Sequence, residues 1–150
     1  MNEMHLVIRE AEEKDLESMI ALYAQLDMDD RQMISLEKAK GIFKKISNYP
    51  FFKVYVAVLD DEIAGTFELL IMDNLGHQGI PSGIIEDVVV VERHQGKGIG
   101  KAMMAYAVDI CRGQGCYKVA LSSNSKRKRA HQFYESLGFK KHGYSFYMEV

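Results

Sequence analysis

Three glycines alternate with other residues in the run Gln95-Gly96-Lys97-Gly98-Ile99-Gly100-Lys101, which follows an apolar stretch. Glycine lets the backbone approach an anion closely, and a helix that follows presents unpaired N–H groups at the positive end of its dipole. Such a loop could cradle a pyrophosphate, which makes a nucleotide-like cofactor the first hypothesis. A glycine-rich surface turn before a helix is the structural alternative.

Two well-known phosphate loops do not fit this run. A Rossmann fingerprint requires G-x-G-x-x-G, whereas the glycines here stand at positions 96, 98 and 100. A Walker loop that ends at Gly100-Lys101 would need glycine at position 95 and serine or threonine at position 102. The chain has Gln95 and Ala102 there, so neither loop is present.

A second charged feature is the run from Lys126 to Arg129, at the expected N-terminus of a helix. The helix dipole makes positive charge unfavourable there, and a bound anion would relieve it. A solvated charge run and a nucleic-acid patch are the alternatives, but no aromatic residues interleave the run and the formal net charge is -2. His77, His94 and His131 lack the spacing of metal ligands, so no metal is expected.

The chain has the length and composition of one globular domain, residues 1–150. Its two cysteines, Cys111 and Cys116, form no C-x-x-C motif and suit packing in a reducing cytoplasm. We find no basic leader followed by a long apolar core, and no apolar run that could span a bilayer. The sequence therefore predicts a cytoplasmic protein with no membrane segment.

Alternating apolar residues predict strands, and apolar residues at helical spacing predict amphipathic helices. The expected order is strand, two helices, a hairpin of two strands, strand, helix, strand, helix and strand. By residue number these elements are 6–11, 12–23, 35–48, 52–59, 63–72, 84–91, 98–113, 117–122, 129–137 and 144–150. The β-branched run 84–91 is expected to be a central strand covered on both faces, and the loop 73–83 could line a substrate pocket.

The glycine run fits the pattern Q/R-x-x-G-x-G/A, as Gln95, Gly98 and Gly100, and in that form it resembles the acetyl-CoA loop of the GNAT family of N-acetyltransferases. The order of the expected elements also resembles that family. The resemblance implies an α/β (α+β) fold, the GNAT acyl-CoA N-acyltransferase fold. That fold has a single mixed sheet with helices on both faces and a splayed central strand pair.

A second family motif, A-x-x-x-Y-x-x-x-G-F, is matched by Ala130, Tyr134, Gly138 and Phe139. The resemblance makes Tyr134 the residue that protonates the departing CoA thiolate. This is chemically sensible because a thiol has a pKa of about 8.5 and a tyrosine of about 10. A core tyrosine on an apolar stripe is the alternative.

The resemblance also implies which residues bind acetyl-CoA. Main-chain groups of the valines would hold the thioester and pantetheine, and the glycine loop would donate amides to the pyrophosphate. Asn124 resembles the family's pantetheine-binding asparagine but lies farther upstream of Tyr134 than is usual, and Arg127 has the more usual spacing. The cofactor-binding residues are then Val88, Val89, Val90, Gln95, Gly96, Lys97, Gly98, Ile99, Gly100, Lys101, Asn124, Arg127 and Tyr134.

An ammonium substrate must lose a proton before its lone pair can attack a thioester. Glu86 and Asp87 precede the valines, and because neighbouring strand residues point to opposite faces, a regular strand would show only one of them to the site. Glu86 is the favoured base, acting through water, with Asp87 as the substitute. An ion pair at the start of the strand is the alternative.

The predicted activity is transfer of the acetyl group of acetyl-CoA to the primary amine of a small polar metabolite by direct attack. Motifs resemble two branches of the family, the aminoalkylphosphonate and the glucosamine-6-phosphate acetyltransferases. A peptide or protein amine acetyltransferase and a catalytically silent acyl-CoA-binding module are the alternatives. The resemblance makes a homodimer a candidate assembly, and it implies neither a nucleic-acid partner nor a membrane.

Overall fold

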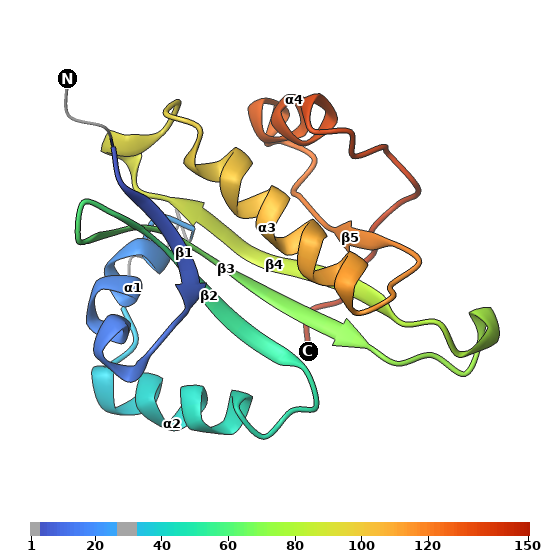
Figure 1. Ribbon diagram of the computed structural model, residues 1–150, viewed down its shortest axis with the longest axis horizontal. Coiled ribbons are helices and arrows are strands. Elements are labelled where there is room, and N and C mark those ends of the chain that lie inside the picture. The colour runs from blue at the N-terminus through green and yellow to red at the C-terminus, as the bar shows by residue number, and fades with distance from the viewer. Residues whose placement is uncertain (1–3, 27–32) are drawn as a thin grey trace. The chain divides into compact units, whose positions relative to one another are not determined.

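The computed structural model describes residues 4–26 and 33–150. The chain divides into two compact units, Met1–Ala120 and Leu121–Val150, and each is described by itself. The first unit is built around a sheet in the order β1-β2-β3-β4-β5, shown in Figure 1. The strands are β1 (Leu6–Glu10), β2 (Phe52–Leu59), β3 (Glu62–Met72), β4 (Ser82–Val90) and β5 (Val119–Leu121). The predicted single mixed sheet is confirmed.

The hairpin of β2 and β3 turns at Asp60 and Asp61, whose φ angles are 48° and 67°. Positive φ at both central positions is the type I′ geometry, which matches the right-handed twist of the two strands. Aspartate tolerates this left-handed backbone better than most residues. The hairpin expected from the sequence is therefore confirmed, with Leu59 opposite Glu62 at its end.

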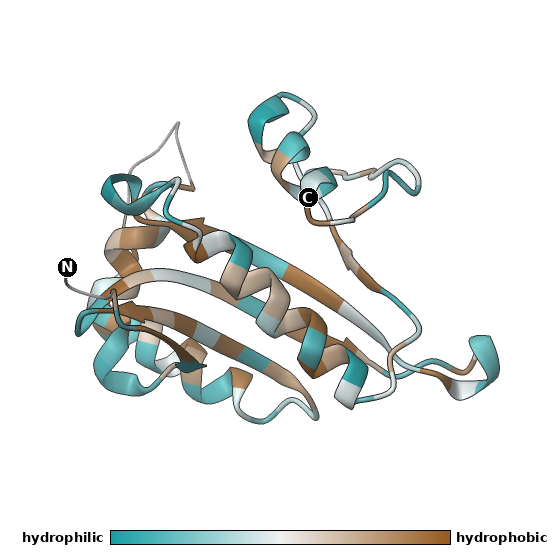
Figure 2. Cartoon of the chain, turned by 45° about the horizontal axis from the view of Figure 1, so that its top comes forward, coloured by the Kyte–Doolittle hydropathy of each residue, from teal (hydrophilic) through white to brown (hydrophobic). Residues whose placement is uncertain are grey.

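Helices cover both faces of the sheet in the first unit, as predicted (Figure 1). One face packs against α1 and α2, where Leu16, Met19 and Ala39 join Val54 and Val56 of β2 in a buried cluster. In Figure 2, apolar and polar stretches alternate along α3, which packs on the other face. The helices are η1 (Glu13–Asp15), α1 (Leu16–Tyr23), α2 (Leu36–Ile46), η2 (His77–Gly79), η3 (Glu92–His94), α3 (Ile99–Gly113) and α4 (Lys128–Ser136).

The face under α3 is packed with aromatic side chains and small residues. Tyr55 stacks on Phe67 at a centroid distance of 5.1 Å, and Tyr106 of α3 meets Tyr55 edge-on at 5.6 Å. A Cβ on Gly65 of β3 would lie 2.7 Å from the Met103 sulfur. The glycine therefore lets the helix lie close to the sheet.

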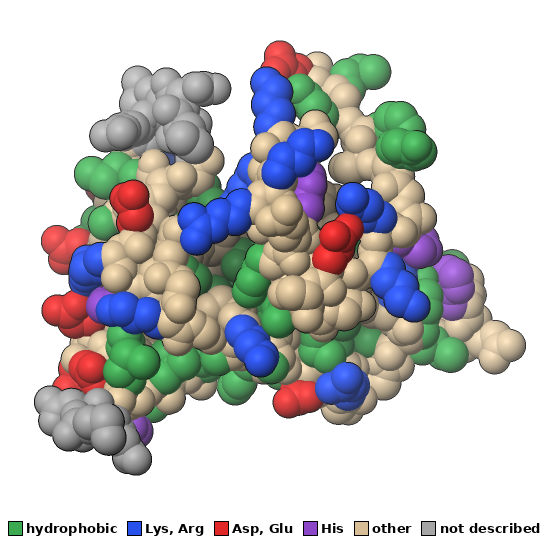
Figure 3. All heavy atoms as spheres, turned by 90° about the horizontal axis from the view of Figure 1, so that it is seen from above, with side chains coloured by type: hydrophobic (Ala, Val, Ile, Leu, Met, Phe, Trp, Pro, Cys, Tyr) green, Lys and Arg blue, Asp and Glu red, His purple; other side chains and the backbone are tan. Residues whose placement is uncertain are grey.

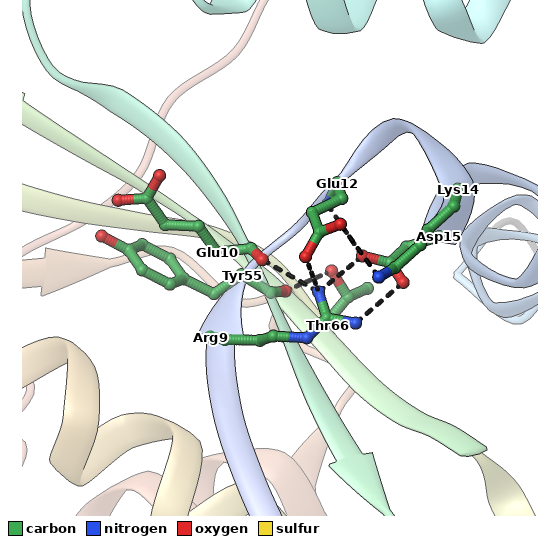
Figure 4. A network of polar contacts seen from close by, with 7 residues as sticks. All are labelled: Arg9, Glu10, Glu12, Lys14, Asp15, Tyr55 and Thr66. Carbon is green, nitrogen blue, oxygen red and sulfur yellow. Dashed lines mark hydrogen bonds and ion pairs between the residues drawn. The ribbon is translucent and has the colours of Figure 1, made fainter. Parts of the chain in front are cut away.

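A buried ion pair ties the first strand to the helix that follows it (Figure 4). Arg9 donates to both carboxylate oxygens of Asp15, at 2.7 and 3.0 Å. The backbone N–H of Glu12 also donates to Asp15, at 2.7 Å, so the carboxylate closes the first turn of the helical segment. The Asp15 residue is only 5% exposed, and the hydrogen bonds from Arg9 hold the pKa of its carboxyl below the usual range.

The second unit contains α4 and the C-terminal segment. Tyr134 of α4 contacts the rings of Phe133 and Phe139, at centroid distances of 5.3 and 5.9 Å. The strand expected at 144–150 is absent, so that prediction is wrong: the segment forms no ladder and its large apolar side chains are exposed. Alternating apolar residues favour a strand, but a strand forms only where a neighbouring strand accepts and donates its hydrogen bonds.

Within the described residues, no helix is long and apolar enough to cross a membrane.

Candidate functional site

A β-bulge interrupts the pairing of β3 and β4 in the middle of the sheet. The register shifts between Thr66 and Glu68, so that Asp87 and Val88 of β4 together lie opposite Phe67 alone. Asp87 has a φ of 49°, in the left-handed region that few residues other than glycine adopt. A bulge leaves its extra residue outside the ladder, so backbone groups at this point are open to another partner.

The bulge changes how β4 presents its two carboxylates. Glu86 and Asp87 are both exposed, although Ile85 before them and Val89 after them are buried. The expectation that this strand is covered on both faces is wrong at its centre, because the bulge bends the strand and brings both side chains to the surface. The regular alternation that would show only one of them is broken as well.

A third carboxylate, Glu68 of β3, completes this cluster. Glu68 is half-buried and lies directly opposite Glu86 in the register of the two strands. Burial, followed by the charges of Asp87 and Glu86, raises the pKa of Glu68 to about 7. Burial also raises the pKa values of Glu86, with a contribution from Asp87, and of Asp87 itself.

Tyr23, the last residue of α1, lies beside this cluster. Burial raises the pKa of its phenol, and Glu68 and Asp87 raise it further. A hydrogen bond with the fully buried Thr66 lowers the pKa of that phenol. The Thr66 hydroxyl donates to the carbonyl oxygen of Tyr55 at 2.7 Å. Tyr23 is therefore a neutral phenol beside Glu68 and Asp87.

Sequence reasoning missed Glu68 and Tyr23. The signal for Glu68 was a single acidic residue inside the apolar run of β3, where an unpaired charge is costly. Tyr23 carried no such signal, because it continued the apolar stripe of α1.

The glycine loop leads directly into α3, whose helix starts at Ile99 after Gly98. Gly96 and Gly98 have φ angles of 79° and 84°, and a Cβ on either would meet no atom within 4 Å. The first turn of α3 contains no acidic residue, and Gly98 has no side chain to cap it. The amide hydrogens of the first turn of α3 are therefore open to an anion, as a pyrophosphate cradle requires.

Other residues of the loop are exposed around this helix start. Gln95 donates its side-chain amide to the carbonyl oxygen of Val90 at 3.1 Å, which ties the loop to the end of β4. Lys97 lies 3.1 Å from the ring of His94, and Lys101 is exposed in the first turn of α3. Both lysines can add positive charge to an anion bound there. The residues of this loop thus fit the pyrophosphate that the sequence predicts here.

In the second unit, α4 begins after a turn closed by Asn124. The Asn124 side chain accepts from the backbone N–H of Lys126 at 2.9 Å, and Arg127 donates its own N–H to the Asn124 carbonyl at 3.0 Å. The run Lys126 to Arg129 is exposed, and Figure 3 shows Lys and Arg side chains projecting from the face that it draws.

Burial raises the pKa of the Tyr134 phenol, while Arg127 lowers it. A phenol whose pKa is raised stays protonated at neutral pH and can act as a proton donor.

The family model described as the acetyltransferase (GNAT) family matches residues 16–139, which span both units. The chain is 33% identical over 144 residues to the glucosamine 6-phosphate N-acetyltransferase of Trypanosoma brucei brucei, covering 91% of this chain and 90% of that protein. It is 27% identical over 139 residues to the aminoalkylphosphonate N-acetyltransferase of Salmonella typhimurium, covering 93% and 88%.

Solved structures show the same fold. The crystal structure of glucosamine-6-phosphate N-acetyltransferase from Arabidopsis thaliana aligns with a TM-score of 0.85 and 28% identity, and the alignment covers 97% of this chain and 98% of that one.

Proposed function

Since this chain belongs to the GNAT family of acetyltransferases, whose donor is acetyl-CoA, we propose that it acetylates the primary amine of a small, polar metabolite that carries a phosphate or phosphonate group. The observation that carries the use of acetyl-CoA as donor is the open N-terminus of α3 behind the left-handed Gly98. Relatives named for glucosamine 6-phosphate and for aminoalkylphosphonates support this acceptor class. Because the family model spans both units, we treat residues 1–150 as one acetyltransferase domain.

The proposed donor site uses backbone groups and positive charge. Amides of the loop from Gly96 to Lys101 bind the pyrophosphate, and the helix dipole adds roughly 0.3–1 kcal/mol for each favourable anionic contact. Main-chain groups of Val88, Val89 and Val90 hold the thioester and pantetheine, and the bulge interrupts the pairing with β3 at Asp87 and Val88, next to this stretch. The loop residues are Gly96, Lys97, Gly98, Ile99, Gly100 and Lys101, and the remaining proposed contacts come from Gln95, Asn124, Arg127 and Tyr134.

The proposed chemistry is direct attack by the amine on the acetyl carbon. Acetyl-CoA supplies an activated acyl group, and this chain supplies the proton transfers. A carboxylate on β4, Glu86 or Asp87, lies beside the acceptor amine, and Tyr134 gives a proton to the departing thiolate. No covalent enzyme intermediate and no metal ion are needed.

An amine panel tests the proposal, with release of the CoA thiol as the measurement. Glucosamine 6-phosphate and an aminoalkylphosphonate are compared with glucosamine and a simple alkylamine, which lack the anionic group. We expect release with the anionic acceptors and at least tenfold less with the neutral ones. Preferred turnover of a lysine peptide would favour the peptide or protein amine alternative, and CoA binding without release from any amine would favour a silent acyl-CoA-binding module.

We also propose that the protein acts in the cytoplasm, where the free thiols of Cys111 and Cys116 would remain reduced.

A homodimer is the proposed assembly. It is supported by the exposed apolar side chains near the C-terminus, which α4 leaves uncovered: Tyr144, Phe146, Tyr147, Met148 and Val150. Light scattering on the full chain tests the assembly, and a monomeric mass would overturn it.

A further inference from the structure

Glu68 is a carboxylate that neither the sequence motifs nor the family resemblance singles out. It lies on β3 between Val54 of β2 and Glu86 of β4, its partners in the register of the sheet. Val54 belongs to the buried cluster under α1 and α2, so Glu68 shares the face of the sheet that these helices cover. Burying an acidic side chain at such a position costs folding free energy unless a partner or a ligand compensates its charge.

The β-bulge determines which groups surround Glu68. In a regular antiparallel pair, only Glu86 would face it, and Asp87 would point to the opposite side. The extra residue in β4 breaks that alternation, and the charges of both Glu86 and Asp87 raise the pKa of Glu68. From α1, Tyr23 approaches the same place. Among residues 4–26 and 33–150, none of the three carboxylates forms an ion pair with a Lys, Arg or His side chain.

Three carboxylates on two adjacent strands repel one another. Like charges directly opposite in a sheet are destabilising, so the group gains most from a cation or a proton. A substrate ammonium supplies both, because it carries a positive charge and a proton that must leave before reaction. This reasoning rests on the proposed function, in which the acceptor is an amine.

We propose that Glu68, rather than Glu86 or Asp87, is the base that takes the proton from the substrate ammonium. Glu86 and Asp87 hold that ammonium by charge. The Glu68 carboxylate gains a proton and becomes a neutral acid, and the freed lone pair forms the C–N bond to the acetyl carbon. As the C–S bond breaks, the sulfur leaves with the electron pair. The nitrogen loses its second proton and the sulfur gains one, so that amide and CoA thiol are the products, and Glu68 then releases its proton to water.

The three carboxylates differ in how well each could hold that proton. Glu68 is half-buried, whereas Glu86 and Asp87 are exposed. A base works best when its pKa lies near the operating pH, and the pKa of Glu68 is about 7. Glu86 and Asp87 are more accessible to water, and their place here is to attract the ammonium by charge.

The pH dependence of kcat/KM for the panel amine that the wild type turns over fastest tests the inference. The wild type should lose activity on the acid side with a midpoint near pH 7. Glu68→Gln should lower kcat/KM by about 10²- to 10⁴-fold and remove that acid limb. The matched variants Glu86→Gln and Asp87→Asn should keep the limb, moved to lower pH because a neighbouring negative charge is gone, and should raise KM.

A second readout needs no turnover. Carbon-13 NMR titration of the Glu68 carboxyl in the wild-type protein should give a midpoint near pH 7, and binding of acetyl-CoA to Glu68→Gln should be unchanged. A titration in the ordinary range of glutamate would overturn the inference, as would an acid limb that survives in Glu68→Gln. A wild type that acetylates no amine of the panel would instead overturn the proposed function, and this inference with it.

Discussion

Gly83 of β4 lies against Cys111 of α3 so closely that a Cβ added to the glycine would overlap the cysteine sulfur. Cys111 is 1% exposed, so the sulfur is enclosed by the surrounding protein and cannot turn out into solvent. The contact fixes the distance between α3 and the sheet at the end of β4 far from the glycine loop. The glycine is therefore needed for packing and not for its backbone angles.

Gly83→Ala should lower the free energy of unfolding by about 1–3 kcal/mol, the usual cost of overpacking a core. Thermal and urea denaturation measure this. The double variant Gly83→Ala/Cys111→Ala removes the overlapping sulfur and should recover part of the loss. Gly113→Ala, where a Cβ would meet no atom within 4 Å, is the matched control. Equal stability of Gly83→Ala and the wild type would show that the helix can move away from the sheet.

The pair of Arg9 and Asp15 predicts a loss of stability in acid. Because the folded pKa of Asp15 lies below its unfolded value, the carboxylate contributes stability above the ordinary aspartate pKa of about 3.9. That contribution disappears as the pH falls toward the lower, folded pKa. Asp15→Asn should cost about 2–4 kcal/mol at pH 7, since it removes the nearer of the two charge partners of the partly buried Arg9 and leaves only the longer contact with Glu12.

Urea denaturation between pH 2 and 7 separates this effect from general acid unfolding. Glu13→Gln is the matched control, because the ion pair of Glu13 with Lys40 is exposed and should contribute less than about 1 kcal/mol. If Asp15→Asn and the wild type lost stability in parallel over this pH range, the buried pair would not be the cause.

Glu68 gives stability the opposite pH dependence. Its folded pKa of about 7 lies above its unfolded value, so the folded state binds more protons between about pH 4.5 and 7. Stability from this group is complete at low pH and is lost as the pH rises toward and beyond 7. Glu68→Gln should therefore be more stable than the wild type at pH 8, by roughly 1–3 kcal/mol.

The measurement is the difference in the free energy of unfolding between Glu68→Gln and the wild type, taken at pH 4.5 and at pH 8 in the same salt. Glu86→Gln should narrow the difference by removing one of the neighbouring charges. If this difference in the free energy of unfolding did not change with pH, Glu68 would have the same pKa in the folded and the unfolded state.

Local signals explain why most of the fold could be predicted. The two aspartates at the turn and the apolar alternation on each side of it predict the β2–β3 hairpin, and Ser35 caps α2 by accepting from the Lys38 N–H at 3.2 Å. Such features depend on residues within a few positions of each other. The C-terminal segment shows the limit, because its pattern favours a strand and cannot specify a partner for it.

The site was less accessible to sequence reasoning because its geometry depends on two strands at once. The bulge at Asp87 appears only when the registers of β3 and β4 are compared. Without the bulge, Glu86 and Asp87 would face opposite ways, and only Glu86 would lie beside Glu68. The glycine loop, by contrast, is a local feature, and Gly98 takes the left-handed backbone on which its role depends.

Gly98→Val should weaken the binding of CoA. At a φ of 84° a residue with a Cβ is strained by roughly 1–2 kcal/mol, and a branched side chain would project from the helix start where the anion would approach. Calorimetry should show at least a tenfold loss of CoA affinity. Gly41→Ala, in an open part of α2, should leave affinity unchanged. Unchanged affinity in Gly98→Val would remove the loop from the donor site.

Tyr134→Phe separates proton donation from packing. Phenylalanine keeps the ring contacts with Phe133 and Phe139 and removes only the hydroxyl, so folding and CoA affinity should change little. If the phenol protonates the leaving thiolate, kcat should fall by about 10²-fold or more. The loss should shrink when the acyl donor has a thiol of lower pKa, because such a thiolate needs less help to depart. Tyr117→Phe, at an exposed tyrosine, serves as the control for removal of a hydroxyl. A Tyr134→Phe variant with the turnover of the wild type would show that this tyrosine only packs.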